Sequence, residues 1–179
     1  MSARRIPPTV HDHAYWVSHL TLRNATGTPT GSGSKSAKGT IDAYSFAFGQ
    51  ADPVVSAQTS APGTLTGGHV GTLAYTQYQR TWAAPATITP ENKLRLTLTS
   101  LRSVQVDAAR AALDSNAELI LDTSSDGDTT LDLFGAFPGA AEVYEDGVRL
   151  CTADGALVGP VGARVPVKSG THETSLRLP

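Results

Sequence analysis

Cysteine is almost absent from this chain of 179 residues, and no long apolar run is present. The single Cys151 cannot form an internal disulfide, which excludes a disulfide framework but leaves the compartment open. No apolar run approaches the roughly 20 residues that a transmembrane helix needs, so we expect no membrane span. Residues 1–8 carry Arg4 and Arg5 with no apolar segment after them, and we expect no signal peptide there.

Positive charge is also scarce. The formal net charge is −2 and the basic residues are scattered, whereas a protein that binds nucleic acid needs clustered Lys and Arg to contact phosphates. This distribution argues against nucleic acid as a partner. Thr, Ser, Gly and Ala are abundant instead, and because such small polar surfaces are common in exported β-proteins, we expect a secreted or cell-surface protein.

Motifs for nucleophilic catalysis are missing as well. The chain has no Gly-x-Ser-x-Gly elbow, and residues 31–36 fail the phosphate-loop pattern because Ser34 stands where a glycine should precede Lys35. Cys151 follows Leu150 in an expected strand, where a thiol is usually inert. These absences favour a chain that is not itself an enzyme.

The clearest positive signal is a two-residue alternation between residues 93 and 134. Leu94, Leu96 and Leu98 alternate with polar residues, which predicts a half-buried antiparallel strand because neighbouring side chains of a strand point to opposite faces. The alternation returns at three further places: Val104 and Val106, Leu119 and Leu121, and Leu131 and Leu133. These rows are the predicted core.

Turn and helix signals separate the strands. Residues 108–113 are rich in alanine and follow Asp107, a good helix-capping residue, so a short helix is predicted there. Three β-hairpins are predicted, with turns at Asp126-Gly127, Asp146-Gly147 and Ser169-Gly170-Thr171. We expect further strands at 14–23, 39–48 and 70–82, and loops at 24–38 and 50–69.

Many short strands with turn signals predict an all-β fold: an antiparallel β-sandwich or open barrel with one short helix. Residues 1–13 are expected to be an extended leader. Residues 14–179 are expected to form a single β domain, and if two β subunits are present they would meet near residues 83–92. We find no internal repeat of fixed period.

Two clusters contain residue types that bind metals. His11 and His13 would lie on one face of an extended segment, as in transition-metal sites of β-sandwich proteins, with His19 or His172 as a third ligand. The alternative is a pair of solvated histidines near a terminus.

Asp122, Asp126 and Asp128 surround an expected turn and offer the carboxylate oxygens that calcium prefers. The alternative interpretation is that these aspartates cap their own backbone amides, as turn aspartates usually do.

Aromatic residues form the remaining candidate site. Trp16, Tyr75, Tyr78 and Trp82 could supply a flat platform on which a polymer chain, a glycan or a polyester, stacks. Because aromatic residues make up only 6% of the chain, the alternative is that the core needs these rings for packing.

Parts of the second half resemble a known class of protein. Asp146 to Leu150, Val165 to His172 and Val104 to Leu113 resemble the last strands of small β-sandwich modules that close secreted bacterial polymer-degrading enzymes. This resemblance implies a non-catalytic module that works beside a hydrolase or lyase. Gly39 to Phe46 and Gly49 resemble, in turn, the secreted ring-forming tube proteins of contractile injection systems.

Three hypotheses follow. The first is an accessory module of an extracellular polymer-active enzyme, which binds polymer or packs on its catalytic partner. The second is a self-assembling structural or tube-forming protein, because the chain combines expected edge strands with two large Thr/Ser/Gly loops. The third is a small metal-dependent enzyme that uses His11 and His13.

Overall fold

The computed structural model describes residues 15–23, 39–65, 71–138, 141–151, 156–159 and 161–177. The chain divides into two compact units. The first, residues 1–48 and 90–179, is called here the sandwich unit; the second, Gly49–Thr89, is called the ribbon unit.

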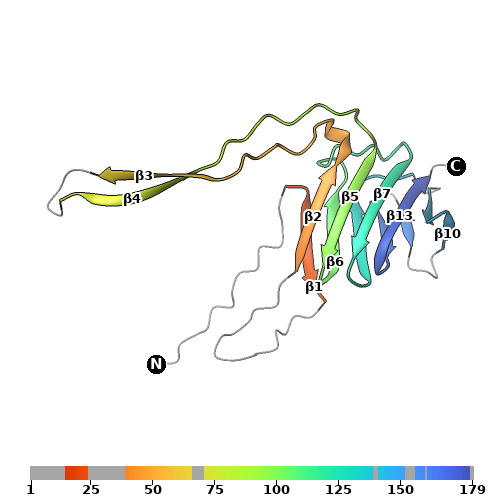
Figure 1. Cartoon of the computed structure of the whole chain (residues 1–179). Coiled ribbons are helices and arrows are strands. Elements are labelled where there is room, and N and C mark those ends of the chain that lie inside the picture. The colour runs from red at the N-terminus through yellow and green to blue at the C-terminus, as the bar shows by residue number, and fades with distance from the viewer. Residues whose placement is uncertain are drawn as a thin grey trace, which may run out of the picture. The chain divides into compact units, whose positions relative to one another are not determined.

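The sandwich unit contains two sheets packed face to face (Figure 1), so the expected all-β sandwich is confirmed. The first sheet has the strand order β1 (Val17–Leu22), β6 (Leu101–Asp107), β8 (Thr129–Phe134), β12 (Gly162–Val167) and β11 (Leu157–Gly159). The second has the order β10 (Val148–Leu150), β9 (Glu142–Glu145), β13 (Gly170–Arg177), β7 (Leu119–Ser125), β5 (Lys93–Thr99) and β2 (Thr40–Ser45).

Two of the strand pairs are parallel, so the sheets are mixed rather than purely antiparallel. β5 lies parallel to β7, and β6 lies parallel to β8. The same offset of 27 residues separates Lys93 from Ile120 and Asp107 from Phe134. A strand–turn–strand unit whose two strands lie in opposite sheets is called here an arch. Two such arches, β5–β6 and β7–β8, are therefore stacked in register.

The arches correct two of the three predicted hairpins. β7 and β8 lie in different sheets, so the turn at Asp126-Gly127 crosses the sandwich, and the turn from β12 to β13 crosses it likewise. The turn at Asp146-Gly147 does join paired neighbours, β9 and β10, and both residues have positive φ (48° and 81°), as a two-residue hairpin requires.

The predicted helix at 108–113 is also wrong. Asp107 caps this stretch as expected, since its Oδ1 accepts the Arg110 N–H at 3.0 Å, but the backbone forms consecutive turns. Ala112 has φ 59°, which ends the helical path after a single turn, and so short a stretch gains too few hydrogen bonds to propagate. The described helical element is a 3-10 helix, η1 (Phe46–Phe48), and within the described ranges no helix is long and apolar enough to cross a membrane.

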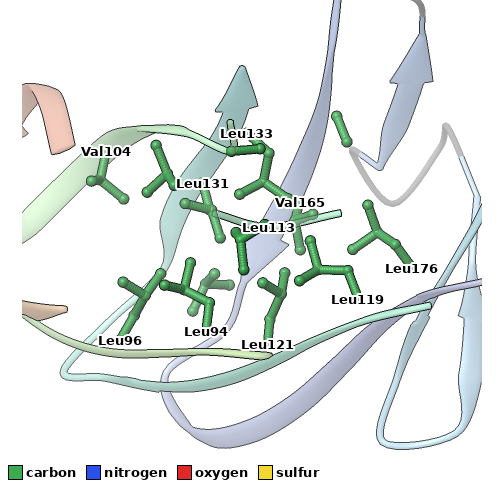
Figure 2. Close-up of a cluster of buried hydrophobic side chains, with 14 of the residues drawn as sticks. Leu94, Leu96, Val104, Leu113, Leu119, Leu121, Leu131, Leu133, Val165 and Leu176 are labelled. Carbon is green, nitrogen blue, oxygen red and sulfur yellow. The ribbon is translucent and has the colours of Figure 1, made fainter. Parts of the chain in front are cut away.

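The core lies between the two sheets. Leu94, Leu96 and Leu121 of one sheet point toward Leu131 and Val165 of the other (Figure 2), and each of the five is 0% exposed. The alternation that predicted these rows is therefore confirmed. Leu113, from the turn that was expected to be a helix, packs in the same cluster.

The ribbon unit is an antiparallel pair, β3 (Thr59–Leu65) and β4 (Leu73–Gln79) (Figure 1). Isolated bridges from Gln50 to Thr87 and from Val55 to Trp82 continue the pairing beyond it. β3 lies inside the stretch 50–69 that was expected to be a loop. That expectation was wrong. The stretch was predicted to be a loop because Pro and Gly are depleted in strands, yet Pro62 and Gly63 occupy the middle of β3.

Candidate functional site

The ribbon unit has an unusual surface: it is exposed, apolar and almost uncharged. Its exposed large apolar side chains are Val54, Val55, Leu65, Leu73, Tyr75, Tyr78 and Trp82, with exposed fractions from 38% to 69%. Asp52 and Arg80 are the only Asp, Glu, Lys or Arg residues between 49 and 89. Large apolar side chains exposed in such number on a small unit usually indicate an interaction site.

The register of the ribbon separates the predicted platform residues. Tyr75 lies opposite Gly63 and Tyr78 opposite Ser60. Because side chains alternate along a strand, Tyr75 and Tyr78 point to opposite faces of the ribbon. Trp82 pairs with Val55 at the isolated bridge, and Trp16 belongs to the sandwich unit. Tyr75 and Tyr78 therefore cannot belong to one flat platform.

Tyr75 has a local structural role. Its ring lies directly against Gly63, at the place where any larger residue would carry its Cβ. A glycine inside a strand leaves its backbone uncovered, and a cross-strand aromatic ring covers it. Tyr75 thus stabilises β3 at its weakest residue, while Tyr78 and Trp82 are 66% and 68% exposed.

A second candidate lies on the outer face of the sheet that contains β6 and β8. A hollow of about 490 Å³ is lined by Trp16, His19, Gln105, Asp107 and Phe134, among others. It combines aromatic rings with hydrogen-bonding side chains, which is the chemistry that binds sugars and polar polymers.

An adjoining hollow of about 420 Å³ also contains His19, Gln105 and Phe134. It extends over Leu157 and Val161, which are 57% and 74% exposed. The two hollows together offer an extended surface rather than a closed pocket.

The three aspartates predicted to bind calcium contact different partners. Asp122 pairs with Lys93 at 2.7 Å. Asp126 accepts the Ser100 N–H at 2.8 and 3.0 Å and the Arg23 guanidinium at 3.1 Å. Asp128 accepts the Ser169 N–H at 3.3 Å.

Asp126 and Asp128 therefore stabilise turns, and Asp122 forms an ion pair between neighbouring strands. The Ser100 N–H, followed by Arg23, lowers the pKa of Asp126 below its usual range, which keeps this carboxylate ionised where the two stacked arches meet. Among the described residues no three or more His, Cys, Asp or Glu side chains come together as a metal site would require. Each of the three aspartates thus has its own partner, and the described residues bring no third ligand to any of them.

Of the four candidate histidines, the structure describes His19 and His172. His11 and His13 lie outside the described residues. His19 is exposed on β1 in a strained backbone conformation with φ 50°. His172 Nδ1 lies 2.7 Å from Asp146 Oδ2, and its Nε2 lies 3.2 Å from the Ser169 carbonyl.

The pair of Asp146 and His172 was missed by sequence reasoning. The hydrogen bond to Asp146, followed by that to the Ser169 carbonyl, raises the pKa of His172. The pair joins the β9–β10 turn to the start of β13, and no sequence pattern signals a contact between residues so far apart.

The low charge of residues 49–89 was visible in the sequence and could have indicated the ribbon surface. Comparison with protein-family models, curated proteins and solved structures finds no match to this chain.

Proposed function

We propose that this protein is a self-assembling structural protein whose ribbon unit is buried between copies of the chain. The single observation that carries this proposal is the exposed, apolar and nearly uncharged surface of residues 49–89. Catalysis is not needed to explain any feature of that surface.

An isolated two-stranded ribbon is marginally stable in water, since it buries little apolar area against the entropy of ordering its residues. Every residue of β4 is exposed, and in β3 Gly63 alone is partly covered. A ribbon that stays in solvent is normally protected by charged side chains, which discourage association. This ribbon lacks them, and burial against another copy would supply the apolar contacts that its own chain does not.

The sandwich unit offers further places for association. Within the described residues, β1 and β2 close one end of the two sheets and β11 and β10 close the other, each pairing on one side alone. Such edge strands are templates for pairing with another chain. Contact between unlike ends of successive copies would generate rings or filaments, as heterologous interfaces do.

Sedimentation of the full chain at micromolar concentration tests the proposal. We expect assemblies larger than a monomer, and we expect Leu73→Lys together with Tyr78→Lys to dissociate them, because both changes place charge on the ribbon. Thr97→Lys together with Thr99→Lys is the matched control, since this pair adds the same two charges at exposed strand positions of the sandwich unit. A strictly monomeric wild type, or equal loss of assembly in the control, would refute self-assembly through the ribbon.

A polymer-binding accessory module is the second candidate, and the hollow lined by Trp16 and Phe134 favours it. In a Trp82→Phe variant, fluorescence reports Trp16 alone. Soluble neutral glycans and a polyester oligomer are the probes, and protection of Trp16 from iodide quenching by one of them is the expected result. Unchanged quenching with all of them would argue against this function.

A further inference from the structure

We infer that β4 pairs edge to edge with β4 of a second copy, so that two ribbon units join into one four-stranded antiparallel sheet. This inference rests on the self-assembly proposed above and identifies the strand through which it occurs. Its basis is the difference between the two outer edges of the ribbon.

The edge of β3 is closed to strand pairing, and the edge of β4 is open. Pro62 stands in the middle of β3 and has no N–H to donate, and proline on an edge strand blocks the addition of a further strand. β4 has the sequence Leu-Ala-Tyr-Thr-Gln-Tyr-Gln, without proline, glycine or charge. Within the described residues β4 pairs with β3 alone, which leaves its other edge available.

Pro62 also indicates which residues of β4 face that open edge. Pro62 lies opposite Thr76, and because its nitrogen cannot join the ladder, this position is one whose backbone groups point away from the partner strand. In an antiparallel pair such positions alternate. Ala74, Thr76 and Tyr78 therefore direct their N–H and C=O groups outward, ready to pair.

A second copy of β4 complements this edge. When two β4 strands overlap fully and antiparallel, their two-fold axis passes through Thr76, the central residue of Leu73–Gln79. Tyr78 then lies opposite Ala74 of the other copy, a large side chain beside a small one. Tyr75 lies opposite Gln77.

Charge also permits this pairing of identical strands. Like charges directly opposite each other would destabilise it, and β4 carries none. A partner of different sequence could carry the opposite charge, so pairing with it would not require an uncharged strand. The complete absence of charge in β4 therefore points to a second copy of the same chain.

Cysteine cross-linking tests the register. In a Cys151→Ser background, Thr76→Cys places two thiols across the two-fold axis, where the Cα atoms of an antiparallel pair lie about 5.5 Å apart, within the range of a disulfide. We expect mild oxidation to give a disulfide-linked dimer. Thr64→Cys, at an outward position on the β3 edge, is the matched control and should stay reduced.

Proline substitution provides an independent readout without cysteine. Thr76→Pro removes one outward N–H from each copy and leaves the pairing with β3 intact, so association should weaken about tenfold or more. Thr64→Pro, on the edge already closed by Pro62, should leave association unchanged. The thermal melt of the sandwich unit shows for each variant whether the chain is folded.

The outcomes separate this inference from the proposed function. Assembly that persists without the Thr76 cross-link and is unchanged by Thr76→Pro shows that copies associate through another edge. Assembly that weakens with Thr76→Pro but never cross-links shows that β4 pairs in another register. Either result overturns the two-fold pairing of two β4 strands. A response of the Thr64 variants alone overturns it in favour of the β3 edge. A wild type that is monomeric at all concentrations overturns self-assembly itself.

Discussion

Truncation of Leu131 to alanine should destabilise the sandwich unit strongly. Leu131 is 0% exposed and occupies the middle of β8, where it lies beside Val104 on one neighbouring strand and Val165 on the other. Leu→Ala substitutions in cores cost about 2–5 kcal/mol, and the cost rises with the volume of the cavity that remains. Strands on both sides and the second sheet across the core prevent collapse here, so we expect about 3–5 kcal/mol.

Urea denaturation followed by far-ultraviolet circular dichroism measures this loss. The midpoint should fall while the slope of the transition stays constant, since the surface exposed on unfolding is unchanged. Leu157→Ala is the matched control: the same substitution in edge strand β11, where the side chain is 57% exposed, should change stability by about 0.5 kcal/mol or less. A loss below about 1.5 kcal/mol for Leu131→Ala, or equal losses for both variants, would refute the placement of β8 in the core.

Which residues face the core could be predicted, because burial and the strand period act on each strand separately. Leu94, Leu96 and Leu98 alternate with polar residues and are 0–1% exposed. Leu119 and Leu121 follow the same rule. Neither result depends on which strands are neighbours.

The pairing of strands could not be predicted, because a hairpin and an arch place the same parity of residues in the core. In β7, Thr123 and Ser125 continue the buried row after Leu121, and Thr129 resumes it in β8. The alternation is the same whether the chain returns beside itself or crosses to the other sheet. The 27-residue offset was not visible in the sequence either. The two arches repeat the same backbone register, but few of their residues are identical at corresponding positions.

The ribbon surface was partly predictable. Tyr75, Tyr78 and Trp82 were candidates either for an exposed platform or for the core, and all three are exposed. Their division between opposite faces depends on the register of β4 against β3, and β3 was not expected to be a strand. The spacing within Tyr75-Thr76-Gln77-Tyr78 already indicates opposite faces in an extended strand, so the platform interpretation required a departure from regular geometry.

Two further predictions test contacts that sequence reasoning did not find. A Cβ at Gly162 would lie 2.5 Å from the Leu133 carbonyl oxygen, so Gly162→Ala should lower the free energy of unfolding in urea by about 1–3 kcal/mol. Gly159→Ala is the control: its Cβ would meet nothing closer than 4.0 Å, and the change should be nearly neutral. Equal denaturation midpoints for the two variants would contradict this packing. The second prediction concerns pH. Asp146 raises the folded-state pKa of His172 above the value of about 6.5 expected for the unfolded chain. A raised pKa means that the folded state holds the proton more tightly, so the stabilisation is complete below the unfolded pKa and is lost as pH rises through the folded pKa. The melting temperature of the wild type relative to His172→Gln should therefore be higher at pH 6 than at pH 8.5. The comparison with His172→Gln removes the titration of the other histidines, and a difference between the two proteins that is independent of pH would show that the proton on His172 does not stabilise the β9–β10 turn against β13.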